Sequence, residues 1–434
     1  MTPARDAPVD VLVVGAGPAG LSSAIAAAER GKRVLILDLG LRAGGQIWRH
    51  RAPAFLPTAG RHWLARARAA GVTVASAARV VDVVSAGELV VDYHGRLDRQ
   101  RTRALILATG AKERMLPFPG WTLPGVVGVG GLQALIKGGL TLSGSRVVIA
   151  GTGPLVFPVA AAAAQAGAVL ELVAEQASFR SVTAFGLGLL AGKPSAIGQA
   201  IGYRWAFRRA PLRTDSWVAA AEGQGRLRRV HVRCAGKSWA IDCDWLATSA
   251  GLSPNTELAQ LLGCAIANDA IRVNESQETT VSGVWAAGEC TGVKGDGFAL
   301  SEGEIAGSAA AGDPEHAQRP QLQRRRAAGR AFSRRLATHF APRPELLQLP
   351  TDDTIICRCE DVRRGQIDPG WTQRQAKLWT RVGMGECQGA VCGPACAALF
   401  GWDQNVARPP LGAPLCGGWS EVLTAERGEV RGQR

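Results

Sequence analysis

The chain has 434 residues, of which 47% are hydrophobic and 20% charged, and its formal net charge is +14. This length allows two or three domains with a large buried core, and the composition is that of a globular protein. The first ten residues, MTPARDAPVD, contain no apolar segment of the signal-peptide kind, which predicts a cytoplasmic location. The most apolar stretch, residues 154–170, contains Gln165 and Gly167 and predicts a buried helix rather than a transmembrane span.

The positive charge is carried mainly by arginine, and its densest run is QRRRAAGR at residues 323–330. Such a run is either an electrostatic patch for nucleic acid or an acidic partner, or the solvated face of a linker helix. No helix-turn-helix, zinc-finger or RNA-binding signature accompanies it. The sequence therefore favours the linker helix and predicts no nucleic-acid partner.

The first chemical signal is a glycine turn between two apolar strands, in residues 9–38. A strand over 10–14 is followed by Gly15, Gly17 and Gly20, then by an alanine-rich helix and a second strand that ends at Asp38. In this spacing the first glycine makes the tight turn, the second lets the backbone approach a pyrophosphate, and the third lets the helix pack on the strand. The helix N-terminus attracts the phosphates, and Asp38 is placed to accept hydrogen bonds from a ribose. The turn alone does not distinguish FAD from NAD.

Later segments indicate which dinucleotide is bound. Residues 42–46 read RAGGQ, residues 104–110 read ALILATG, and residues 281–310 hold a short strand, the pair Gly288 and Glu289, a glycine loop and a helix of small residues. This order resembles the glutathione-reductase-like flavoproteins, an α/β fold with two dinucleotide-binding Rossmann domains. The resemblance implies that the Gly-acid pair holds the ribityl chain of FAD, although that group usually has Asp at the position of Glu289. It also implies that the following helix points its positive N-terminus at the flavin.

The candidate FAD-binding residues come from these segments and from the strand after the RAGGQ loop. They are Gly15, Gly17, Pro18, Ala19, Gly20, Asp38, Arg42, Gly45, Gln46, Val80, Thr109, Gly110, Gly288 and Glu289.

A second strand–turn–helix–strand pattern covers residues 146–175. Its turn contains Gly151 and Gly153, but Val156 stands at the third glycine position, where it should hold the helix away from the strand and crowd a pyrophosphate. Glu175 closes the second strand as a candidate ribose acceptor. The pattern is either a second nucleotide site, for an adenine nucleotide or NAD(P)H, or a Rossmann scaffold without a hydride donor. Residues 176–215 predict helices that either face a partner or pack on this domain.

Nine of the ten cysteines fall into two groups, and residues 1–233 contain none. The first half therefore offers no C-x-x-C or C-x4-C pair, so a dithiol mechanism of the glutathione-reductase or thioredoxin-reductase kind is not supported. The scattered cysteines are interpreted as small buried hydrophobic residues. These are Cys234, Cys243, Cys264 and Cys290.

The second group is a four-cysteine pattern near the C-terminus. Cys357 and Cys359 form C-x-C, and Cys387 and Cys392 form C-x4-C. Four thiolates in two close pairs predict a tetrahedral sulfur site for zinc or for an iron–sulfur cluster. The C-x-C pair is unusual for zinc, and glycines around the second pair would let backbone N–H groups approach cluster sulfurs, which favours [2Fe–2S]. Cys396 is an alternative ligand to Cys392.

The segments CRCEDV and RVGMGECQGAVCG resemble the bacterioferritin-associated-ferredoxin-like (BFD-like) [2Fe–2S] domain. More specifically, they resemble that domain as fused to the flavoprotein subunit of bacterial opine oxidases and hydroxyproline dehydrogenases. The segments GAGPAG, GGQIWR, ATGAKERMLPFPGWTLPGVVGVGG, GTGPL, GLSPNTELAQLLGC and AAGECTG extend the resemblance over nearly the whole chain. The B subunit of hydrogen cyanide synthase is a more distant relative. Two segments depart from the family pattern, DPGWTQRQ between the cysteine pairs and APLCGGWSEVL in the tail.

The resemblance implies an α-type subunit that carries FAD and a [2Fe–2S] cluster and relays electrons. Its cluster ligands would be Cys357, Cys359, Cys387 and Cys392. A separate FAD-containing β-type oxidase subunit would oxidise the amino acid or opine. Further expected partners are a small ferredoxin-like subunit and an electron acceptor, with any contact to the inner membrane made through the complex.

We therefore expect a discontinuous FAD domain over residues 1–120 and 250–315, with a nucleotide-type domain over 121–249. A basic helical linker (316–350), a cluster domain (351–400) and a tail (401–434) with little helical or strand pattern follow. The expected function is that of a relay subunit in an amino-acid or opine dehydrogenase complex, of the D-hydroxyproline type. The alternatives are a self-sufficient NAD(P)H-dependent flavin oxidoreductase, and a redox-sensing or assembly protein with a structural metal. No catalytic residue is assigned, because none of the six histidines belongs to a recognisable acid–base pair.

Overall fold

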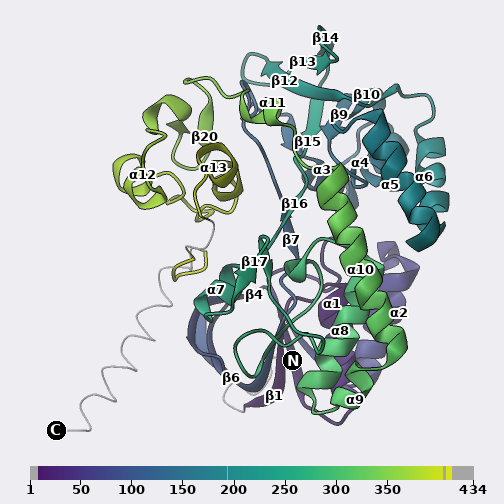
Figure 1. Cartoon of the computed structure of the whole chain (residues 1–434), viewed down its shortest axis with the longest axis vertical. Coiled ribbons are helices and arrows are strands. Elements are labelled where there is room, and N and C mark those ends of the chain that lie inside the picture. Colours follow the sequence, from purple (N-terminus) through teal and green to yellow (C-terminus); the bar gives the residue numbers. More distant parts are fainter. Residues whose placement is uncertain (1–7, 193, 404–406, 413–434) are drawn as a thin grey trace. The chain divides into compact units, whose positions relative to one another are not determined.

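The computed structural model describes residues 8–192, 194–403 and 407–412. The chain divides into two compact units (Figure 1). Unit 1 takes residues 1–111, 254–330 and 405–434, and unit 2 takes residues 112–253 and 331–404. The domain boundaries expected from the sequence stay predictions.

Unit 1 is built on a seven-stranded sheet in the order β3-β2-β1-β6-β5-β4, with β19 also paired to β6. Strands β3, β2, β1, β6 and β19 are parallel, whereas β4, β5 and β6 pair antiparallel. The long strand β6 serves both parts, because residues 96–101 pair with β5 and residues 102–107 pair with β1. The strands are β1 (Val9–Val14), β2 (Val34–Asp38), β3 (Thr73–Ser76), β4 (Ala78–Ser85), β5 (Glu88–Tyr93), β6 (Arg96–Leu107) and β19 (Val284–Ala286).

The helices of unit 1 include the two that follow the predicted nucleotide motifs. They are η1 (Pro53–Phe55), α1 (Pro18–Ala28), α2 (Thr58–Ala69), α7 (Glu257–Leu261), η2 (Glu289–Thr291), α8 (Asp296–Ala310) and α9 (Pro314–Ala317). Short strands β17 (Ile266–Ala267) and β18 (Ala270–Ile271) form a separate ribbon. The strand, helix and strand predicted over residues 9–38 are confirmed as β1, α1 and β2.

Helices α1 and α8 pack at very short range through glycine. A Cβ atom on Gly303 would collide with the carbonyl oxygen of Ala19, and one on Gly307 would collide with the carbonyl oxygen of Ser23. Only glycine at these positions allows the two backbones to approach so closely. The helix that follows Gly288 is therefore fixed against the helix that follows the first glycine turn.

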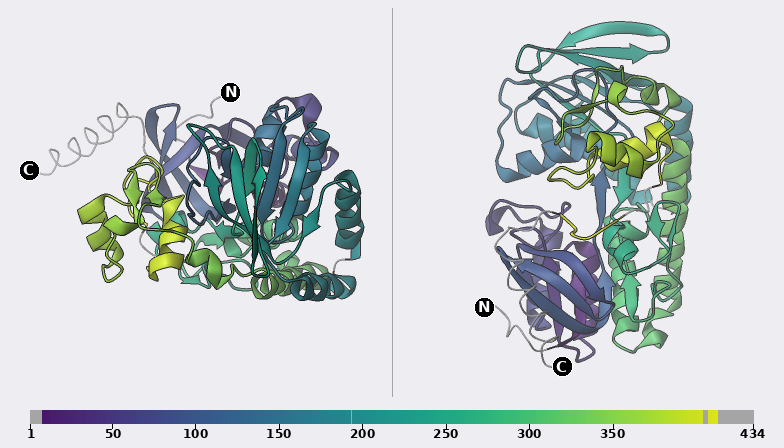
Figure 2. Two further views of the ribbon diagram at one scale, coloured as in Figure 1. Left: turned by 90° about the horizontal axis from the view of Figure 1, so that it is seen from above. Right: turned by 90° about the vertical axis from the view of Figure 1, so that its left-hand side faces the viewer.

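Unit 2 contains a parallel sheet in the order β11-β10-β9-β15-β8 and an antiparallel sheet β12-β13-β14. The pattern predicted over residues 146–175 is confirmed as β9, α4 and β10, and α5 and α6 occupy the predicted helical segment that follows. Figure 2 shows β13 and β14 as a hairpin. The strands are β8 (Val126–Gly128), β9 (Arg146–Gly151), β10 (Val169–Glu175), β11 (Leu212–Arg213), β12 (Ser216–Glu222), β13 (Arg229–Cys234), β14 (Lys237–Asp242) and β15 (Trp245–Thr248). The helices are α3 (Val129–Gly138), α4 (Val156–Gln165), α5 (Phe179–Gly192) and α6 (Pro194–Ala206).

The C-terminal part of unit 2 is small and mainly helical. It comprises β20 (Ile355–Cys357), β21 (Val362–Arg363), η3 (Arg364–Gln366), α12 (Gln373–Thr380) and α13 (Cys392–Phe400). Its core is formed by residues such as Ile356, Val382 and Trp402, together with three of the cysteines. The unusual segment DPGWTQRQ provides the start of α12, because Thr372 and Gln375 form a reciprocal capping box there.

The remaining elements connect these parts. They are β7 (Ala111–Glu113), β16 (Leu252–Pro254), α10 (Pro320–His339) and α11 (Pro344–Leu347). The arginine-rich run lies on α10, where Arg324, Arg325 and Arg330 are exposed. Arg326 departs from the predicted solvated face, because it is buried and donates to the carbonyl of Asn274 at 2.7 Å. Among the described residues, no helix is long and apolar enough to cross a membrane. The tail segment APLCGGWSEVL, with most of the predicted tail, lies outside the described residues.

Candidate functional site

The glycine turn after β1 has the geometry of a phosphate cradle. Gly15 has φ +109°, and a Cβ atom there would collide with the carbonyl oxygen of Ala108. A Cβ atom on Gly20 would collide with the carbonyl oxygen of Gly15, so glycine is needed for α1 to lie this close to the turn. Helix α1, which includes the predicted Pro18 and Ala19, begins directly after Gly17, and no side chain caps its first turn. Its first N–H groups are therefore directed at a place where an anion is stabilised.

Asp38 holds the glycine turn against the loop after β2. Its Oδ2 accepts a hydrogen bond from the N–H of Ala16 at 2.5 Å, and its Oδ1 accepts one from the N–H of Gly40 at 2.7 Å. Burial raises the pKa of Asp38, and these two hydrogen bonds oppose the rise. Each carboxylate oxygen has a second acceptor position, so the predicted ribose contact is compatible with this arrangement.

The RAGGQ loop lies against the same turn. A Cβ atom on Gly45 would lie 2.9 Å from Cα of Gly17, so the two glycine backbones face each other. The other predicted residues of this loop, Arg42 and Gln46, are exposed. Gln46 accepts a hydrogen bond from Nε of Arg49 at 3.1 Å.

The end of β6 is fixed by a reciprocal pair of hydrogen bonds. The hydroxyl of Thr109 donates to the carbonyl of Asn255 at 2.8 Å, and Nδ2 of Asn255 donates to the carbonyl of Thr109 at 2.8 Å. The N–H of Asn255 also donates to the carbonyl of Gly110 at 2.9 Å. Sequence reasoning missed Asn255, because nothing in the local GLSPN segment reveals a partner 146 residues away. The predicted Val80 lies on β4, paired with Val91.

The Gly-acid pair lies at the start of α1. Gly288 has φ +85°, and a Cβ atom there would lie 2.7 Å from Cβ of Ala19. Glu289 begins the short helix η2. Burial raises the pKa of Glu289, whereas a hydrogen bond from the N–H of Gly295 and the charge of Lys294 lower it. The structure therefore brings the predicted ribityl-binding pair next to the predicted pyrophosphate turn.

A buried ion pair supports this loop, and sequence reasoning missed it. Nζ of Lys294 lies 2.8 Å from Oε1 of Glu302, and both side chains are only 1% exposed. Oε2 of Glu302 accepts from the N–H of Gly288 at 3.0 Å, and the hydroxyl of Thr291 lies 3.0 Å from the same oxygen. The sequence offered little signal, because Glu302 is one of three acidic residues in α8, with Asp296 and Glu304. The pair therefore holds the loop that carries Glu289.

The residues of unit 1 fit a dinucleotide such as FAD. At Gly110 no atom lies within 4 Å of the place that a Cβ atom would take, and at Gly17 only Cα of Gly45 does, at 4.0 Å. The first turn of α1 carries no acidic residue that would repel a phosphate. The glycine turn therefore has open space beside uncapped backbone N–H groups, and Asp38 and Glu289 lie nearby.

The second glycine turn differs from the first. Gly153 has φ +82°, but α4 begins only at Val156, three residues later, whereas α1 begins directly after its second glycine. Val156 is buried, and a Cβ atom on Gly151 would lie 3.2 Å from its Cγ2. The valine therefore fills the space next to the strand, as its position in the sequence predicts.

Glu175 points into the protein rather than toward solvent. Glu175 is only 3% exposed. Its Oε2 accepts a hydrogen bond from the N–H of Gly153 at 2.7 Å, and its Oε1 accepts one from the N–H of Ala177 at 2.8 Å. Burial raises the pKa of Glu175 to about 7, against the effect of these hydrogen bonds.

The predicted cluster ligands meet as two thiol pairs. The thiols of Cys392 and Cys357 lie close enough for Cys357 to affect the pKa of Cys392, and those of Cys359 and Cys387 close enough for Cys387 to affect the pKa of Cys359. Cys392 also contacts Cys396, one helical turn further along α13, and this contact together with burial raises the pKa of Cys392 well above its usual range. In the part of the chain that the structure describes, no three His, Cys, Asp or Glu side chains are already arranged as a metal centre.

Backbone N–H groups surround these thiols. The N–H of Gly383 is directed at the sulfur of Cys357, and the N–H of Cys387 is directed at the sulfur of Cys359. Burial raises the pKa of Cys357, and the N–H groups oppose the rise. A Cβ atom on Gly385 would collide with Cβ of Cys359, so this glycine is required for the two cysteine segments to meet. Such N–H groups stabilise the negative charge of thiolates and of cluster sulfur.

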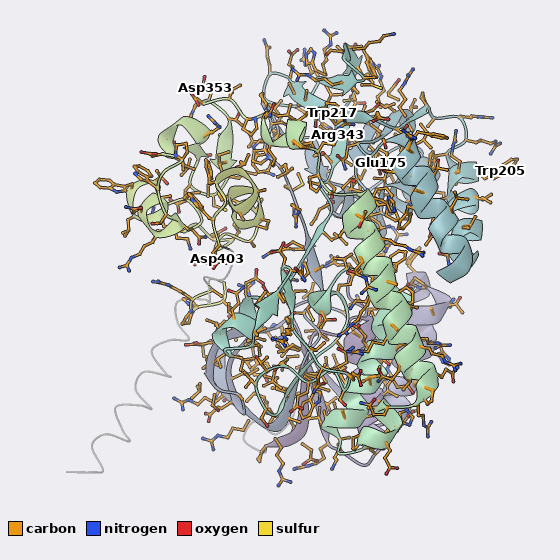
Figure 3. All side chains as sticks on the ribbon, viewed as in Figure 1. Glu175, Trp205, Trp217, Arg343, Asp353 and Asp403 are labelled. Carbon is orange, nitrogen blue, oxygen red and sulfur yellow. The ribbon has the colours of Figure 1, made fainter. Side chains whose placement is uncertain are left out.

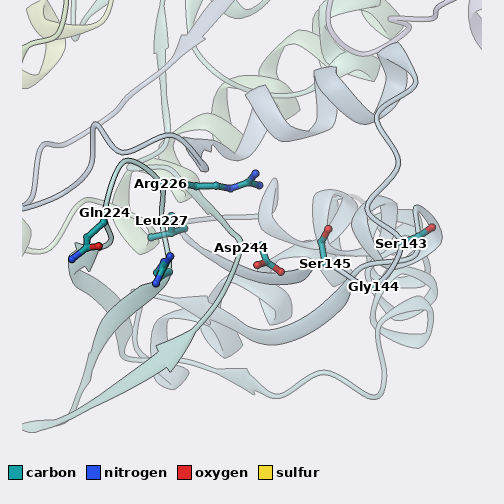
Figure 4. A pocket seen from close by; sticks show the side chains of 8 residues that line it. Ser143, Gly144, Ser145, Gln224, Arg226, Leu227 and Asp244 are labelled. Carbon is teal, nitrogen blue, oxygen red and sulfur yellow. The ribbon is translucent and has the colours of Figure 1, made fainter.

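A separate open pocket of about 590 Å³ lies elsewhere in unit 2 (Figure 4). It is lined by residues 143–145, Gln224, residues 226–228 and Asp244. Residues 143–145 precede β9 and Asp244 precedes β15, so this side of the pocket lies at the amino ends of two parallel strands. Nucleotides bind at the carboxyl ends of such strands, and this pocket is therefore not the nucleotide site.

Comparison with known families supports a dinucleotide cofactor. Residues 9–321 match the model of the pyridine nucleotide-disulphide oxidoreductase family. The chain belongs to this family. Membership implies FAD as the cofactor and makes the chain a flavin-dependent oxidoreductase.

Two relatives are similar over nearly their whole length. The A subunit of opine oxidase from Rhizobium meliloti (strain 1021) is 32% identical over 93% of this chain and 96% of its own. The hydrogen cyanide synthase subunit HcnB of Pseudomonas aeruginosa is 32% identical over 88% of this chain and 90% of its own. Within the pyridine nucleotide-disulphide oxidoreductases, the chain thus belongs with these subunits, as its motifs predict.

Solved structures confirm the predicted fold. L-proline dehydrogenase from P. horikoshii superposes with a TM-score of 0.65 at 18% identity, covering 94% of this chain and 78% of the other. Thioredoxin reductase of T. acidophilum superposes with a TM-score of 0.55 at 22% identity, covering 70% of this chain and 98% of the other. At these identities the likeness concerns the fold alone.

The family is named for disulphide chemistry, but the cysteine nearest to the Gly-acid pair is not suited to it. Cys290 is fully buried, and its Sγ lies 3.3 Å from the carbonyl oxygen of Ala287 and 3.4 Å from that of Leu107. Burial raises the pKa of Cys290 to about 11, so it is protonated at neutral pH. All nine cysteines in the described residues are free thiols.

Proposed function

We propose that this chain is the FAD- and [2Fe–2S]-carrying subunit of a heteromeric amino-acid or opine dehydrogenase or oxidase complex, with a D-hydroxyproline-like substrate class. It would accept electrons from the oxidation of a CH–NH or CH–NH2 donor in a partner subunit and pass them on. The names of the relatives, the A subunit of opine oxidase and the HcnB subunit of hydrogen cyanide synthase, support a role as one subunit of several.

One observation carries the proposal. The same chain combines a dinucleotide cradle in unit 1 with two contacting cysteine pairs in unit 2, and backbone N–H groups are directed at the sulfurs of Cys357 and Cys359. The cysteine nearest to the cradle, Cys290, is a buried thiol and offers no dithiol outlet. Electrons that arrive at a flavin in this chain therefore need another route, and the cysteine centre supplies one.

The residues assigned to each cofactor follow from the contacts. The glycine turn of β1 and α1, Asp38, Gly110, Gly288 and Glu289 would hold FAD. The thiols of Cys357, Cys359, Cys387 and Cys392 would ligate the cluster, since Cys392 interacts with both Cys357 and Cys387. When bound, FAD accepts two electrons and a [2Fe–2S] cluster passes them singly.

The proposed partners are a FAD-containing β-type oxidase subunit, a small ferredoxin-like subunit and a terminal electron acceptor. The complex is placed in the cytoplasm, with any contact to the inner membrane made by the complex as a whole. Affinity purification of the chain from its native host should recover an amine-oxidising flavoprotein in fixed stoichiometry. Recovery of the chain alone, with full activity toward NADH or NADPH, would favour the self-sufficient reductase instead.

The cofactor content is tested on the full-length protein purified without oxygen. We expect one FAD, about two iron atoms and about two sulfides per chain, and an electron paramagnetic resonance signal after reduction by dithionite. Stoichiometric zinc without such a signal would contradict the cluster and leave a structural metal site.

Single substitutions identify the fourth ligand. Cys392→Ser should lower the iron content and the reduced signal to below about a tenth of wild type, because a serine hydroxyl is a poor ligand for this cluster. Cys396→Ser, one helical turn away and equally buried, is the matched control and should keep both. The reverse result would assign the ligand to Cys396.

A further inference from the structure

The carboxyl ends of the parallel strands in unit 2 are covered by a segment of the same chain. This covering segment, residues 340–349, runs from the end of α10 through α11. Family membership leads one to expect a pyridine nucleotide at this edge of the sheet, since dinucleotides bind at the carboxyl ends of such strands. The covering segment instead contacts the same groups that a nucleotide would need.

The first contact is with the glycine turn. The hydroxyl of Thr152, between Gly151 and Gly153, donates to the carbonyl of Phe340 at 3.2 Å. Cγ of Phe340 lies 3.7 Å from the place that a Cβ atom on Gly153 would take. The face on which a pyrophosphate would lie is therefore occupied by an aromatic residue. That ring is also held by Phe185 on α5, with centroids 4.9 Å apart in an edge-to-face arrangement.

The second contact is with the end of β10, where a ribose would lie. Nε2 of the buried Gln176 donates to the carbonyl of Ala341 at 3.0 Å, and its Oε1 accepts from the N–H of Arg343 at 3.0 Å. The neighbouring Glu175 is turned inward by its bonds to Gly153 and Ala177. The residue is only 3% exposed, so little of its carboxylate is accessible to a ribose.

Arg343 clamps the covering segment to unit 2. Its guanidinium lies 3.0 Å from Oδ1 of Asp215 and 3.2 Å from Oε1 of Glu345, and it stacks over the ring of Trp217 at 4.6 Å (Figure 3). The same guanidinium donates to the carbonyl of Gln176 at 3.2 Å. Because Glu345 belongs to the covering segment itself, the attachment comes from the stacking on Trp217 and the bonds to Asp215 and to the carbonyl of Gln176.

Little space remains beneath the segment. The cavity at this edge has a volume of about 30 Å³, and its lining includes Gly151 and Gln176 from the sheet with Leu346 and Leu349 from the covering segment. This volume holds about one water molecule and is far too small for any part of a nucleotide. In unit 1, by contrast, the space at Gly110 is open.

We propose that residues 340–349 occupy the nucleotide place of the second Rossmann unit in cis, so that this chain takes no hydride from NADH or NADPH. Combined with the proposed function, on which this last step rests, electrons enter only from the organic donor that the partner subunit oxidises. Residues 146–175 then keep the strand–turn–helix–strand pattern of a nucleotide-binding unit, while residues 340–349 occupy the position of its ligand.

The test uses the full-length protein with its cofactors. Calorimetric titration of wild type with NADH, NADPH and ATP should give no saturable binding below about 1 mM. In anaerobic stopped-flow mixing, NADH and NADPH should leave the flavin absorbance unchanged, while dithionite bleaches it. Wild-type binding below about 100 µM that is lost in Gly153→Val would overturn the proposal.

Variants that release the covering segment give the positive arm. Phe340→Gly combined with Arg343→Ala should bind at least one of the three nucleotides at least tenfold more tightly than wild type. Gln176→Ala, which removes two hydrogen bonds to the segment and less of its packing, is the second opening variant in case the first does not fold. Arg364→Ala, which removes a different arginine of unit 2, paired with Asp352, is the matched control and should resemble wild type.

An opened variant with a wild-type circular dichroism spectrum and no gain in nucleotide binding would also overturn the proposal. The failure of the proposed function would look different. Absence of iron or of a partner subunit would leave these binding results unchanged, because they depend on residues 340–349 and the parallel sheet beneath them and not on the four cysteines.

Discussion

At the scale of single residues, the buried pair of Lys294 and Glu302 is the most consequential feature that local sequence does not reveal. Its two side chains are 1% exposed and 2.8 Å apart. A buried charge that loses its partner destabilises a protein by about 3 kcal/mol or more, whereas removing both charges costs far less. Because Glu302 also accepts the N–H of Gly288, the pair links stability to the geometry of the FAD loop.

We predict that Lys294→Met lowers the free energy of unfolding by about 3 kcal/mol and lowers the retained FAD per chain. The double variant Lys294→Met with Glu302→Gln should recover more than half of that loss, since the amide oxygen of the introduced glutamine can still accept the N–H of Gly288. Urea denaturation and flavin absorbance measure both effects. Asp242→Asn, which breaks an exposed ion pair with Arg229, should change stability by less than about 1 kcal/mol. Equal losses in the single and double variants would refute the linkage.

The titration of Glu175 makes the free energy of unfolding depend on pH. Its folded pKa of about 7 lies above the usual glutamate pKa of 4.5, so the folded state holds this proton more tightly than the unfolded state. The associated stability is complete below about pH 4.5, falls as pH rises toward 7, and is absent above that value. The full change is on the order of 3 kcal/mol.

In Glu175→Gln the fall of the unfolding free energy between pH 5 and pH 7 should be shallower than in wild type by an amount of this order. Loss of one backbone hydrogen bond would lower stability by about 1 kcal/mol at every pH, without changing the slope. Urea denaturation at four pH values measures the slope. Glu315→Gln, at an exposed position on α9, should keep the wild-type slope; identical slopes for Glu175→Gln and wild type would show that Glu175 is not the titrating group.

At the scale of elements, the contact between α1 and α8 places the two halves of the predicted FAD site. We predict that Gly307→Ala lowers the free energy of unfolding by about 2 kcal/mol, because the added Cβ would collide with the carbonyl oxygen of Ser23. It should also weaken FAD retention, since α1 would move away from Gly288. Gly297→Ala is the matched control on the same helix: no atom lies within 4 Å of its Cβ position, and replacing a helical glycine there should be neutral or stabilising by up to about 1 kcal/mol. Equal effects of the two substitutions would argue against close packing.

The elements that sequence predicts well are those with a local signal. Glycine spacing and apolar runs are enough for β1–α1–β2 and β9–α4–β10, because the turn, the helix and both strands lie within about 30 residues. The double use of β6, parallel at one end and antiparallel at the other, has no such signal. Its pattern of side chains is set by partners from three different parts of the chain.

The residues of the candidate site, like the elements of the fold, are predictable where the signal is local and not where it depends on distant contacts. The glycines, Asp38 and the four cysteines are recognisable because their spacing is itself the signal. The bond between Thr152 and Phe340 joins residues 188 positions apart, and Glu302 becomes notable only once its burial is known. The sequence did not distinguish a second nucleotide site from a Rossmann scaffold without a ligand. Only tertiary contacts reveal that residues 340–349 cover this edge of the sheet.

At the scale of the whole molecule, the proposed cofactors predict how many electrons one chain can store. Anaerobic titration with dithionite should require about three electron equivalents per chain, two for FAD and one for the cluster. Cys359→Ser should require about two, with an unchanged flavin spectrum, because it removes an exposed ligand without touching unit 1. A wild-type value of about two, with no absorbance change outside the flavin bands, would refute the cluster.

The packing of α8 on α1 also determines when unit 1 can finish folding during synthesis. Strand β19 and helix α8 leave the ribosome only after all of residues 112–253 have been synthesised, yet β6 and α1 need them as neighbours. Until then the nascent chain presents an unpaired strand edge and an uncovered helix, which are the surfaces that chaperones bind and that aggregate when unprotected. FAD loading should therefore be a late event in biogenesis, and a chain stalled before residue 310 should emerge without flavin.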